Sequence, residues 1–301
     1  DSVWAEAGHE IASAQFRLPV QQTEPERLDS KDMPKITACE CGAEVTLCGS
    51  DFTYIFNKDL GHFTSIQSNG VELLAGRTRF SAWRAPTSND GRFSAGPWNA
   101  QRISNPTERV SACTVRTDSD KFIQICTDYA LGGVSHLPFA RYSVFWMVFG
   151  SGEISVSVSA EVRSNIDTLP RFGLEIPMRP GTEFVKYFGC GPDSTYSDMR
   201  NLGKMGVYDS TVSKEYTHYI RPQETGNHID VRWAAVSDHE GRGLLFKGLP
   251  TFNFKALHYT QEDLAKAPYD RVLKARPETF VEIDYKQEGM GSASCGPVLA
   301  E

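Results

Sequence analysis

Short segments in which apolar and polar residues alternate recur along most of this chain, and they constrain its fold more than any other feature. Alternate side chains of a strand point to opposite faces, so this pattern is typical of a β-sheet with one buried face. Five such segments are enriched in β-branched and aromatic residues and are bounded by Gly, Pro, Asn or Asp: Phe52–Phe56, Phe122–Cys126, Ala140–Phe149, Glu153–Val162 and Thr279–Tyr285. No regular series of helices separates them. The pattern therefore predicts an all-β protein built as a large antiparallel sandwich.

One segment has the features of a helix. In Thr260–Ala267, Thr260 can act as the N-cap and Asp263 stands at the third helical position, while Pro268 ends the run. Acidic residues in the first turn favour the helix dipole. We expect a single helical turn here and none elsewhere.

The N-terminal part differs in character from the rest. Ser13–Pro19 has the pattern of a strand, and the polar, proline-bearing residues 21–32 are typical of a linker. A lone strand cannot bury itself, so it either joins a partner sheet or is the remnant of a preceding domain. From residue 35 onward the strand pattern continues without a second linker or an internal repeat. We therefore predict two parts, residues 1–34 and a single domain over residues 35–301.

Composition excludes several classes of protein. Of the 301 residues, 40% are hydrophobic and 23% are charged, and the formal net charge is −7. Lys and Arg form no cluster, so we expect no nucleic-acid partner. No apolar stretch approaches the roughly 20 residues of a membrane span, so we expect a soluble protein with no membrane partner.

The seven cysteines match no metal-binding pattern. Their number is odd, so at least one is free or intermolecular, and no His or second Cys-x-x-Cys follows Cys39, Cys41 and Cys48 closely. We interpret them as small buried hydrophobic residues in a reducing compartment, with a disulfide as the alternative. No targeting signal is visible. Cytoplasm and periplasm both stay open, with the cytoplasm favoured.

The segment Phe80–Trp98 combines residue types that suit a sugar. Trp83, Arg84, Asn89 and Asp90 place an aromatic ring, a guanidinium, an amide and a carboxylate within eight residues. Aromatic faces stack on sugar C–H groups, and planar polar groups bind hydroxyls. The alternative is a structural role, in which a buried Trp–Arg pair closes a strand. Glycines bracket the following residues 91–97, which we expect to be a mobile loop carrying Phe93 toward a ligand, with an exposed apolar patch around it.

Three further residues are candidates with plain alternatives. Arg171 would line the concave sheet of such a sandwich, or would form a salt bridge within the sheet. His218 could bind a hydroxyl or a metal, but a structural histidine with satisfied hydrogen bonds is the simpler interpretation. Glu224 belongs to a turn and a buried ion pair, with a chance of ligand contact.

Several motifs, taken together, resemble the C-terminal part of the β-galactosidases of glycoside hydrolase family 2. Besides Phe80–Trp98 they are Ala5–His9, Ala14–Leu18, Tyr187–Pro192 with Tyr196 and Asp198, Tyr216–Tyr219, Pro222–Asn227 and Arg232–Trp233. Each is weak alone, but their order and spacing match. The resemblance implies a galactose-mutarotase-like supersandwich of antiparallel sheets, the small-chain domain (domain 5), preceded by a remnant strand of an immunoglobulin-like domain.

The resemblance also implies where the chemistry lies. The family's catalytic glutamates and metal-binding His belong to an upstream barrel, so we expect no catalytic residue, metal or cofactor in this chain. For the parent enzyme the resemblance implies Mg²⁺, Na⁺ and a homo-oligomer. The resemblance places Gly241 at the position of an aperture Trp that some members carry, so we expect Trp98 or Phe93 to replace that ring. The residues implied at the substrate or the active-site mouth are Trp83, Arg84, Asn89, Asp90, Phe93, Trp98, Arg171, His218 and Glu224.

Two classes of function follow. In the first, the chain is a non-catalytic domain of a β-galactosidase that packs on the catalytic barrel of the same polypeptide, shapes the active-site mouth and contacts the β-galactoside. The isolated chain would then be inactive. In the second, it is a stand-alone aldose 1-epimerase or a carbohydrate-binding module. We expect the first, because epimerases are complete chains and this one starts with what resembles the end of another domain. An adhesive sandwich would not predict the Trp83–Asp90 motif.

Overall fold

The computed structural model describes residues 3–16, 18–20, 32–104, 106–166 and 168–291, without the side chain of Phe93. These residues form sixteen strands, all paired antiparallel. The strands are β1 Thr37–Cys41, β2 Glu44–Cys48, β3 Phe52–Asn57, β4 His62–Ser68, β5 Val71–Glu72, β6 Arg79–Ser81, β7 Thr107–Arg116, β8 Phe122–Gly132, β9 Ala140–Phe149, β10 Ile154–Val162, β11 Arg171–Met178, β12 Phe184–Gly191, β13 Lys204–Thr211, β14 His228–Ser237, β15 Gly243–Leu257 and β16 Thr279–Gln287. The five predicted strands are confirmed, and the fold is all-β as expected.

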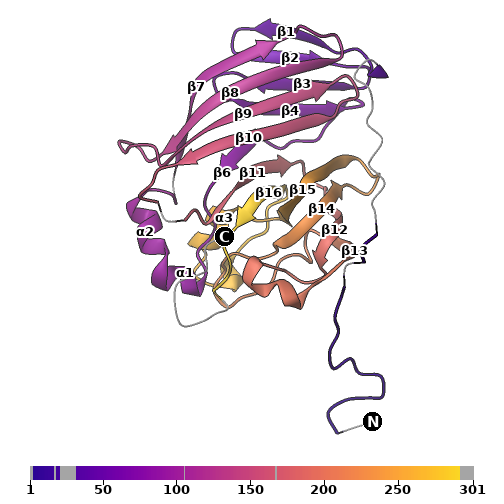
Figure 1. Ribbon diagram of the computed structural model, residues 1–301, viewed down its shortest axis with the longest axis vertical. Helices are drawn as coiled ribbons and strands as arrows, with labels where there is room; N and C mark the ends of the chain where they lie inside the picture. Colours follow the sequence, from indigo (N-terminus) through magenta and orange to yellow (C-terminus); the bar gives the residue numbers. More distant parts are fainter. Residues whose placement is uncertain (1–2, 17, 21–31, 105, 167, 292–301) are drawn as a thin grey trace.

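The strands form three sheets (Figure 1). A five-stranded sheet has the order β1-β2-β3-β4-β5, a four-stranded sheet β10-β9-β8-β7, and a seven-stranded sheet β13-β12-β14-β15-β16-β11-β6. The first two lie face to face in the upper half of Figure 1, and the seven-stranded sheet lies below them. Strand β6 is thus the edge where the chain passes from the sandwich into the larger sheet.

An aromatic cluster fills the space between the two upper sheets. Alternate residues of β9 are buried, and the Trp146 ring lies 5.3 Å from Phe63 and 6.1 Å from Phe56, both from the facing sheet. Phe80 of β6 joins the same cluster through Trp146 and Tyr142. The period-two pattern works here as expected, because one face of each strand supplies this core.

The helices correct one prediction. The helix at Thr260 is confirmed as α3, Gln261–Lys266, and Thr260 and Asp263 form a capping box. The glycine-bracketed loop, however, is helical: it forms α1, Ser88–Phe93, and α2, Ala95–Ala100. Two 3₁₀ helices, η2 Ser197–Leu202 and η3 Asp270–Val272, were also not predicted. None of the helices in the described ranges has the length and apolar character needed to cross a membrane.

The N-terminal segment lies beside the edge of the large sheet without joining it. No strand forms in residues 3–16 and 18–20, so the strand predicted at Ser13–Pro19 is absent from this structure. The Gln15 amide instead exchanges two hydrogen bonds of 2.7 Å with the backbone of Met205 in β13, and Lys204 pairs with Glu10 at 3.1 Å. These contacts use the side chains of Gln15 and Glu10, not a ladder of backbone hydrogen bonds, so the segment forms no strand against β13.

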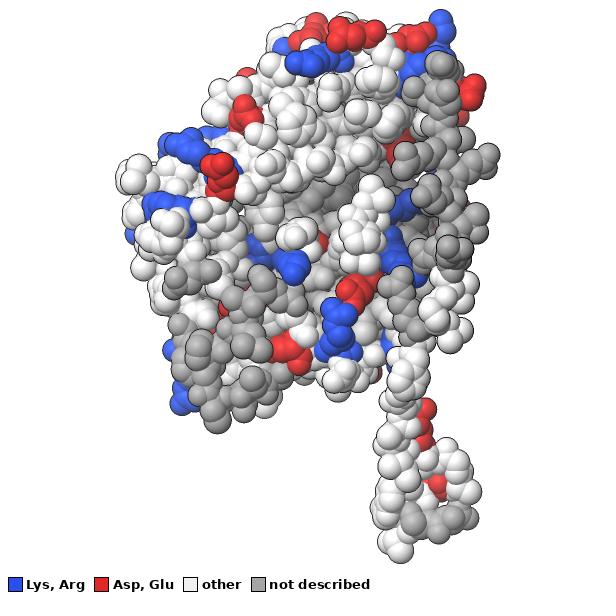
Figure 2. Space-filling view, in the orientation of Figure 1, with Lys and Arg blue, Asp and Glu red and all other residues white. Residues whose placement is uncertain are grey.

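The surface carries mixed charges, and the cysteines are less buried than expected. On the face of Figure 2, Lys and Arg lie among Asp and Glu without forming a continuous basic area. Six cysteines in the described ranges are free; Cys190 is buried, but Cys39 and Cys41 are exposed on the edge strand β1. Cys48, Cys113 and Cys126 are partly buried, so among the described cysteines the prediction of burial is confirmed for Cys190 alone. It fails most clearly for Cys39 and Cys41, because an edge strand leaves its outer face in solvent.

Candidate functional site

The segment that follows β6 is shaped by local sequence. Thr87 caps α1 by accepting a hydrogen bond from the backbone N–H of Asp90 at 3.0 Å, and the Asp90 carboxylate accepts one from the N–H of Thr87 at 2.9 Å. This reciprocal capping box satisfies two backbone donors that would otherwise be unpaired at a helix start. It starts a helix where glycines alone suggested a loop. The motif Thr-x-x-Asp was visible in the sequence and could have predicted it.

Arg84 is the centre of this segment. Its guanidinium is fully buried and makes a bidentate contact with Asp90, at 3.1 Å from Nε and 2.9 Å from Nη2. It also donates to the backbone carbonyls of Glu288 and Gly289, the latter at 2.7 Å. Burial alone would lower the pKa of Arg84, but the Asp90 charge outweighs it and raises that pKa. The guanidinium therefore stays charged and joins two chain segments about 200 residues apart.

The remaining contacts of the segment fix its backbone. The N–H of Ala85 donates to the Gln261 amide oxygen at 2.6 Å, and the carbonyl of Ala85 accepts from the N–H of Glu224 at 3.1 Å. The Asn89 amide donates to the carbonyls of Met290 at 3.0 Å and Gly291 at 3.2 Å. Residues 84–90 are thus held from α3, from the loop before β14 and from the end of β16.

The two tryptophans lie inside the domain. Trp83 is 8% exposed and Trp98 3% exposed, and both belong to the hydrophobic core. The Arg84 guanidinium lies 5.9 Å from the centre of the Trp98 ring. This contact agrees with the structural alternative, a buried Trp–Arg pair. The expectation of an exposed apolar patch centred on these two rings is wrong, because helix α2 turns Trp98 inward. The structure does not describe the side chain of Phe93.

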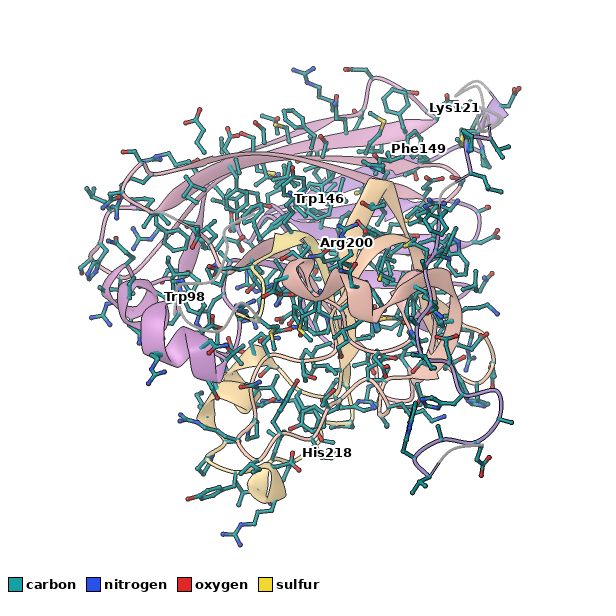
Figure 3. All side chains as sticks on the ribbon, turned by 60° about the horizontal axis from the view of Figure 1, so that its bottom comes forward. Trp98, Lys121, Trp146, Phe149, Arg200 and His218 are labelled. Carbon is teal, nitrogen blue, oxygen red and sulfur yellow. The ribbon has the colours of Figure 1, made fainter. Side chains whose placement is uncertain are left out.

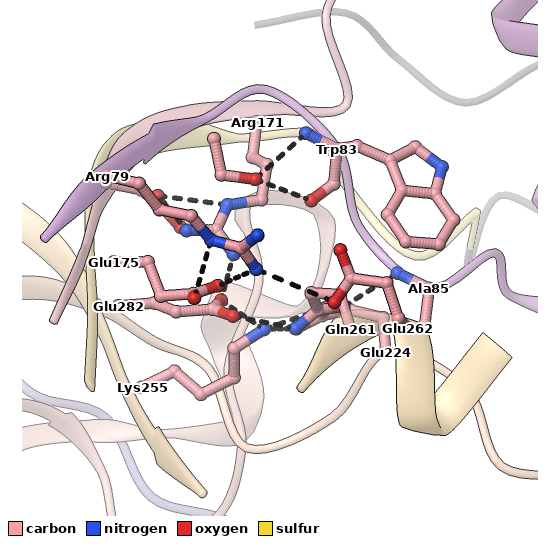
Figure 4. A network of polar contacts seen from close by, with 12 residues as sticks. Arg79, Trp83, Ala85, Arg171, Glu175, Glu224, Lys255, Gln261, Glu262 and Glu282 are labelled. Atoms are coloured by element: carbon pink, nitrogen blue, oxygen red, sulfur yellow. Dashed lines mark hydrogen bonds and ion pairs between the residues drawn. The ribbon is translucent and has the colours of Figure 1, made fainter. Parts of the chain in front are cut away.

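Arg171 and Glu224 belong to a buried polar layer on one face of the seven-stranded sheet (Figure 4). Arg171 of β11 contacts Glu282 and, at 2.7 Å, Asp284, both on β16. Lys255 of β15 lies 2.7 Å from Glu224 and 2.7 Å from Glu282. Arg171 thus forms the salt bridge within the sheet, and Glu224 the buried ion pair, that were the plainer interpretations.

The layer is ordered by strand register. Arg79, Glu175, Glu282 and Lys255 stand directly opposite one another on β6, β11, β16 and β15. The two cations at the ends of this row neutralise the two carboxylates between them. Arg79 lies 2.8 Å from Glu175, and Lys255 lies 2.7 Å from Glu282. Gln261 closes the layer by donating to Glu282 at 3.0 Å while accepting from Ala85. The layer therefore supports the segment that carries Arg84.

The layer holds more negative than positive groups. Four of its carboxyl groups are buried and face three cations: the carboxyls belong to Glu175, Glu224, Glu282 and Asp284, and the cations to Arg79, Arg171 and Lys255. Burial raises the pKa of Asp284 to about 7 against the opposing effect of Arg171, with the Glu282 charge adding to the rise. Burial opposes ionisation of Glu282 as well, but Arg171 and Lys255 hold its pKa below the usual value. Asp284 therefore binds a proton at a higher pH than an exposed aspartate does.

His218 is not part of this assembly. Its side chain is 74% exposed, its Nδ1 lies 2.9 Å from Asp270, and its ring meets Tyr216 edge-on. Figure 3 places it at a different edge of the molecule from Trp98. Hydrogen bonds from Tyr216 and His218 lower the pKa of Asp270, so His218 contributes to a polar contact at the surface.

The structure brings Arg84, Asn89, Asp90 and Trp98 together and links them to Arg171 and Glu224 through the polar layer. Sequence reasoning missed three residues of this assembly that come from far along the chain: Lys255, Gln261 and Glu288. Asp198 was named only as part of a family motif, without a role. The closely spaced glycines in Gly289-Met-Gly291 were a usable signal of special backbone. In the described part of the chain, no group of three or more His, Cys, Asp or Glu side chains could hold a metal ion.

Comparison with known proteins gives a consistent result. Residues 48–301 match the family model described as "Beta galactosidase small chain". The chain is 32% identical over 292 residues to a β-galactosidase of Priestia megaterium, 30% over 253 residues to one of Staphylococcus xylosus, and 27% over 299 residues to one of Actinobacillus pleuropneumoniae. These alignments cover 97%, 84% and 97% of this chain but only 28%, 25% and 29% of the relatives. The chain thus spans less than a third of the length of the proteins it matches.

Proposed function

This chain belongs to the family of β-galactosidase small chains, and from that membership we propose that it is a non-catalytic C-terminal domain of a β-galactosidase, an enzyme that hydrolyses terminal β-D-galactosides. The observation that carries the proposal is the match over residues 48–301 to the small-chain family. The relatives share about a quarter of their length with it. Its partner would be the catalytic barrel of the same polypeptide. The full-length enzyme would bind Mg²⁺ and Na⁺ and would form a homo-oligomer.

We further propose that the domain shapes the active-site mouth. Six of the predicted site residues are buried and stabilise the segment around α1 from inside the domain: Trp83, Arg84, Asp90, Trp98, Arg171 and Glu224. Their polar groups are engaged inside the domain, so their role is to fix the short helix α1 and the chain beside it. Sugar contact would come from the outer surface of these segments. The mutarotase-like supersandwich, the boundary at residues 34 and 35 and the remnant domain at the N-terminus are parts of the same proposal.

The epimerase alternative has less support. It needs a histidine and a carboxylate facing an open cleft. His228 and Glu215 do lie 2.6 Å apart, but the histidine is fully buried against Tyr187, with ring centres 4.3 Å apart. A buried pair of this kind stabilises a core and offers no access to a sugar.

A complementation assay tests the proposed function. We would express this chain and the upstream remainder of its polypeptide separately and measure hydrolysis of a chromogenic β-galactoside by each and by the mixture. We expect no turnover by this chain alone, because retaining glycosidases need two carboxyl groups at a substrate cleft, and we expect turnover by the mixture. Turnover by this chain alone, undiminished by purification, would contradict the proposal. So would a full-length protein without galactosidase activity.

A further inference from the structure

The four residues Glu288–Gly291 continue β16 without belonging to a sheet. Strand β16 ends at Gln287, and the backbone that follows has no strand partner in the described part of the chain. Buried backbone groups need hydrogen bonds, and outside helices and sheets these come from side chains or water. Here the N–H of Glu288 donates to the carbonyl of Pro170 at 2.9 Å, and three side chains bind other backbone groups of the segment: Arg84, Asn89 and Asp198. We call this group the backbone clamp.

Each member of the backbone clamp binds two backbone groups of the segment. Arg84 donates to the carbonyls of Glu288 and Gly289, and Asn89 donates to those of Met290 and Gly291. The Asp198 carboxylate accepts from the N–H groups of Met290 at 3.0 Å and of Gly291 at 2.9 Å.

The glycines of the segment fit the clamp closely. A Cβ on Gly289 would lie 2.5 Å from the Asp198 carboxyl carbon. Gly291 has a φ of +80°, and a Cβ there would lie 2.7 Å from the Asn89 amide nitrogen. Only glycine lets the backbone approach these side chains so closely.

The clamp joins parts of the chain that are remote in sequence. Arg84 and Asn89 flank the start of α1, Asp198 lies in η2, and the segment they hold lies beyond β16. Binding and catalytic residues lie disproportionately on connecting segments that a rigid scaffold holds in place. A catalytic or binding site also loses activity when its supporting residues let it shift by about 1 Å.

We propose that Arg84, Asn89 and Asp198 are positioning residues of the parent β-galactosidase, which hold Glu288–Gly291 and α1 together as one rigid unit of the active-site mouth. This inference rests on the proposed function. It assigns a role to Asp198, which lies outside the Trp83–Trp98 segment. The clamp touches no reacting atom, so it should affect how well the galactoside is bound more than how fast it is cleaved.

The test uses the full-length enzyme with Asp198→Asn, which keeps the shape but removes the charge and one acceptor oxygen. The matched control is Asp230→Asn, which removes the exposed ion pair between Asp230 and Arg200 of the same 3₁₀ helix. We expect Asp198→Asn to raise KM for a galactoside about tenfold, as a loss of roughly 1.4 kcal/mol implies. We expect kcat to change less than KM, and the control to behave as the parent. In the double variant with Arg84→Met, the effects should be less than multiplicative, because both residues hold one segment.

A second measurement does not depend on activity. Amide hydrogen exchange of Met290 and Gly291 should speed up in Asp198→Asn and not in Asp230→Asn. Kinetics of a folded Asp198→Asn enzyme within twofold of the parent would overturn the positioning role. Unchanged exchange at both amides would overturn the clamp itself. A parent enzyme inactive on galactosides would overturn the proposed function, while the exchange experiment would still decide whether the clamp exists.

Discussion

The two faces of the seven-stranded sheet are built from neighbouring residues of the same strands, but one face is apolar and the other is charged. On one face Phe80, Leu174, Ile283 and Phe254 stand opposite one another across β6, β11, β16 and β15 and pack into the hydrophobic core. On the other, one residue along, stand Arg79, Glu175, Glu282 and Lys255. On the apolar face, a change in side-chain size lowers the free energy of unfolding in proportion to the space left unfilled. The charged face is buried too, and it depends on every charge having a partner.

The largest expected effect separates the two faces directly. Lys255→Met should destabilise the protein by about 3–5 kcal/mol, because it leaves Glu224 and Glu282 buried without their shared cation. The exposed pair of Lys186 with Asp209 is the control: Lys186→Met should cost less than about 1 kcal/mol. Urea unfolding of both variants measures the difference. If Lys255→Met were as mild as the control, the charged face would not be a coupled, buried layer.

The second-largest expected effect is a dependence of stability on pH through Glu288. Burial raises the pKa of Glu288 to about 7 from 4.5, with Asp90 adding to the rise while Arg84 and Thr168 oppose it. The folded protein therefore holds a proton that the unfolded chain releases, so this group's contribution to stability is present below pH 4.5 and is lost as the pH rises toward 7. Glu288→Gln should flatten that loss. Thermal unfolding between pH 4 and 8 measures it, and a parallel curve for parent and variant would contradict it.

A smaller effect is expected on the apolar face. Phe254→Leu, one residue from Lys255, should cost about 1–2 kcal/mol, because the smaller side chain keeps an apolar surface and leaves only a partly filled space. Urea unfolding again provides the measurement, with Leu257→Met as a volume-conserving control. A cost for Phe254→Leu that equals that of Lys255→Met would remove the contrast between the faces.

The smallest effect concerns the helix that carries the candidate site. Thr87→Ala removes the side-chain half of the capping box and should cost about 1 kcal/mol, whereas Thr87→Ser keeps the hydroxyl and should cost much less. Thermal unfolding compares them. Equal losses in the two variants would mean that the hydroxyl does not cap α1.

Particular residues show how far sequence reasoning reached. The strand Thr279–Tyr285 was predicted from its alternation, and β16 covers it. The capping box at Thr260 was recognised, whereas the same signal at Thr87 was passed over in favour of the glycines that follow. Arg84, Asn89 and Asp90 were selected for their chemistry. The glycines of Gly289-Met-Gly291 indicate special backbone, but not its partners, because the contact joins positions about 200 residues apart.

By itself, the sequence predicted five of the strands, the alternation of apolar and polar faces along them and the capped helix α3, because these depend on side-chain spacing and on bonds between near neighbours. The tertiary structure alone decided that the polar face of β16 is buried. An alternating strand normally turns its polar face to water, but here α3, the loop at Glu224 and the segment of Arg84 cover that face. Charges can be buried there only because Arg79 of β6 and Lys255 of β15 stand in register with carboxylates and Arg171 of β11 reaches Glu282 and Asp284. Register between distant strands is a property of the folded chain.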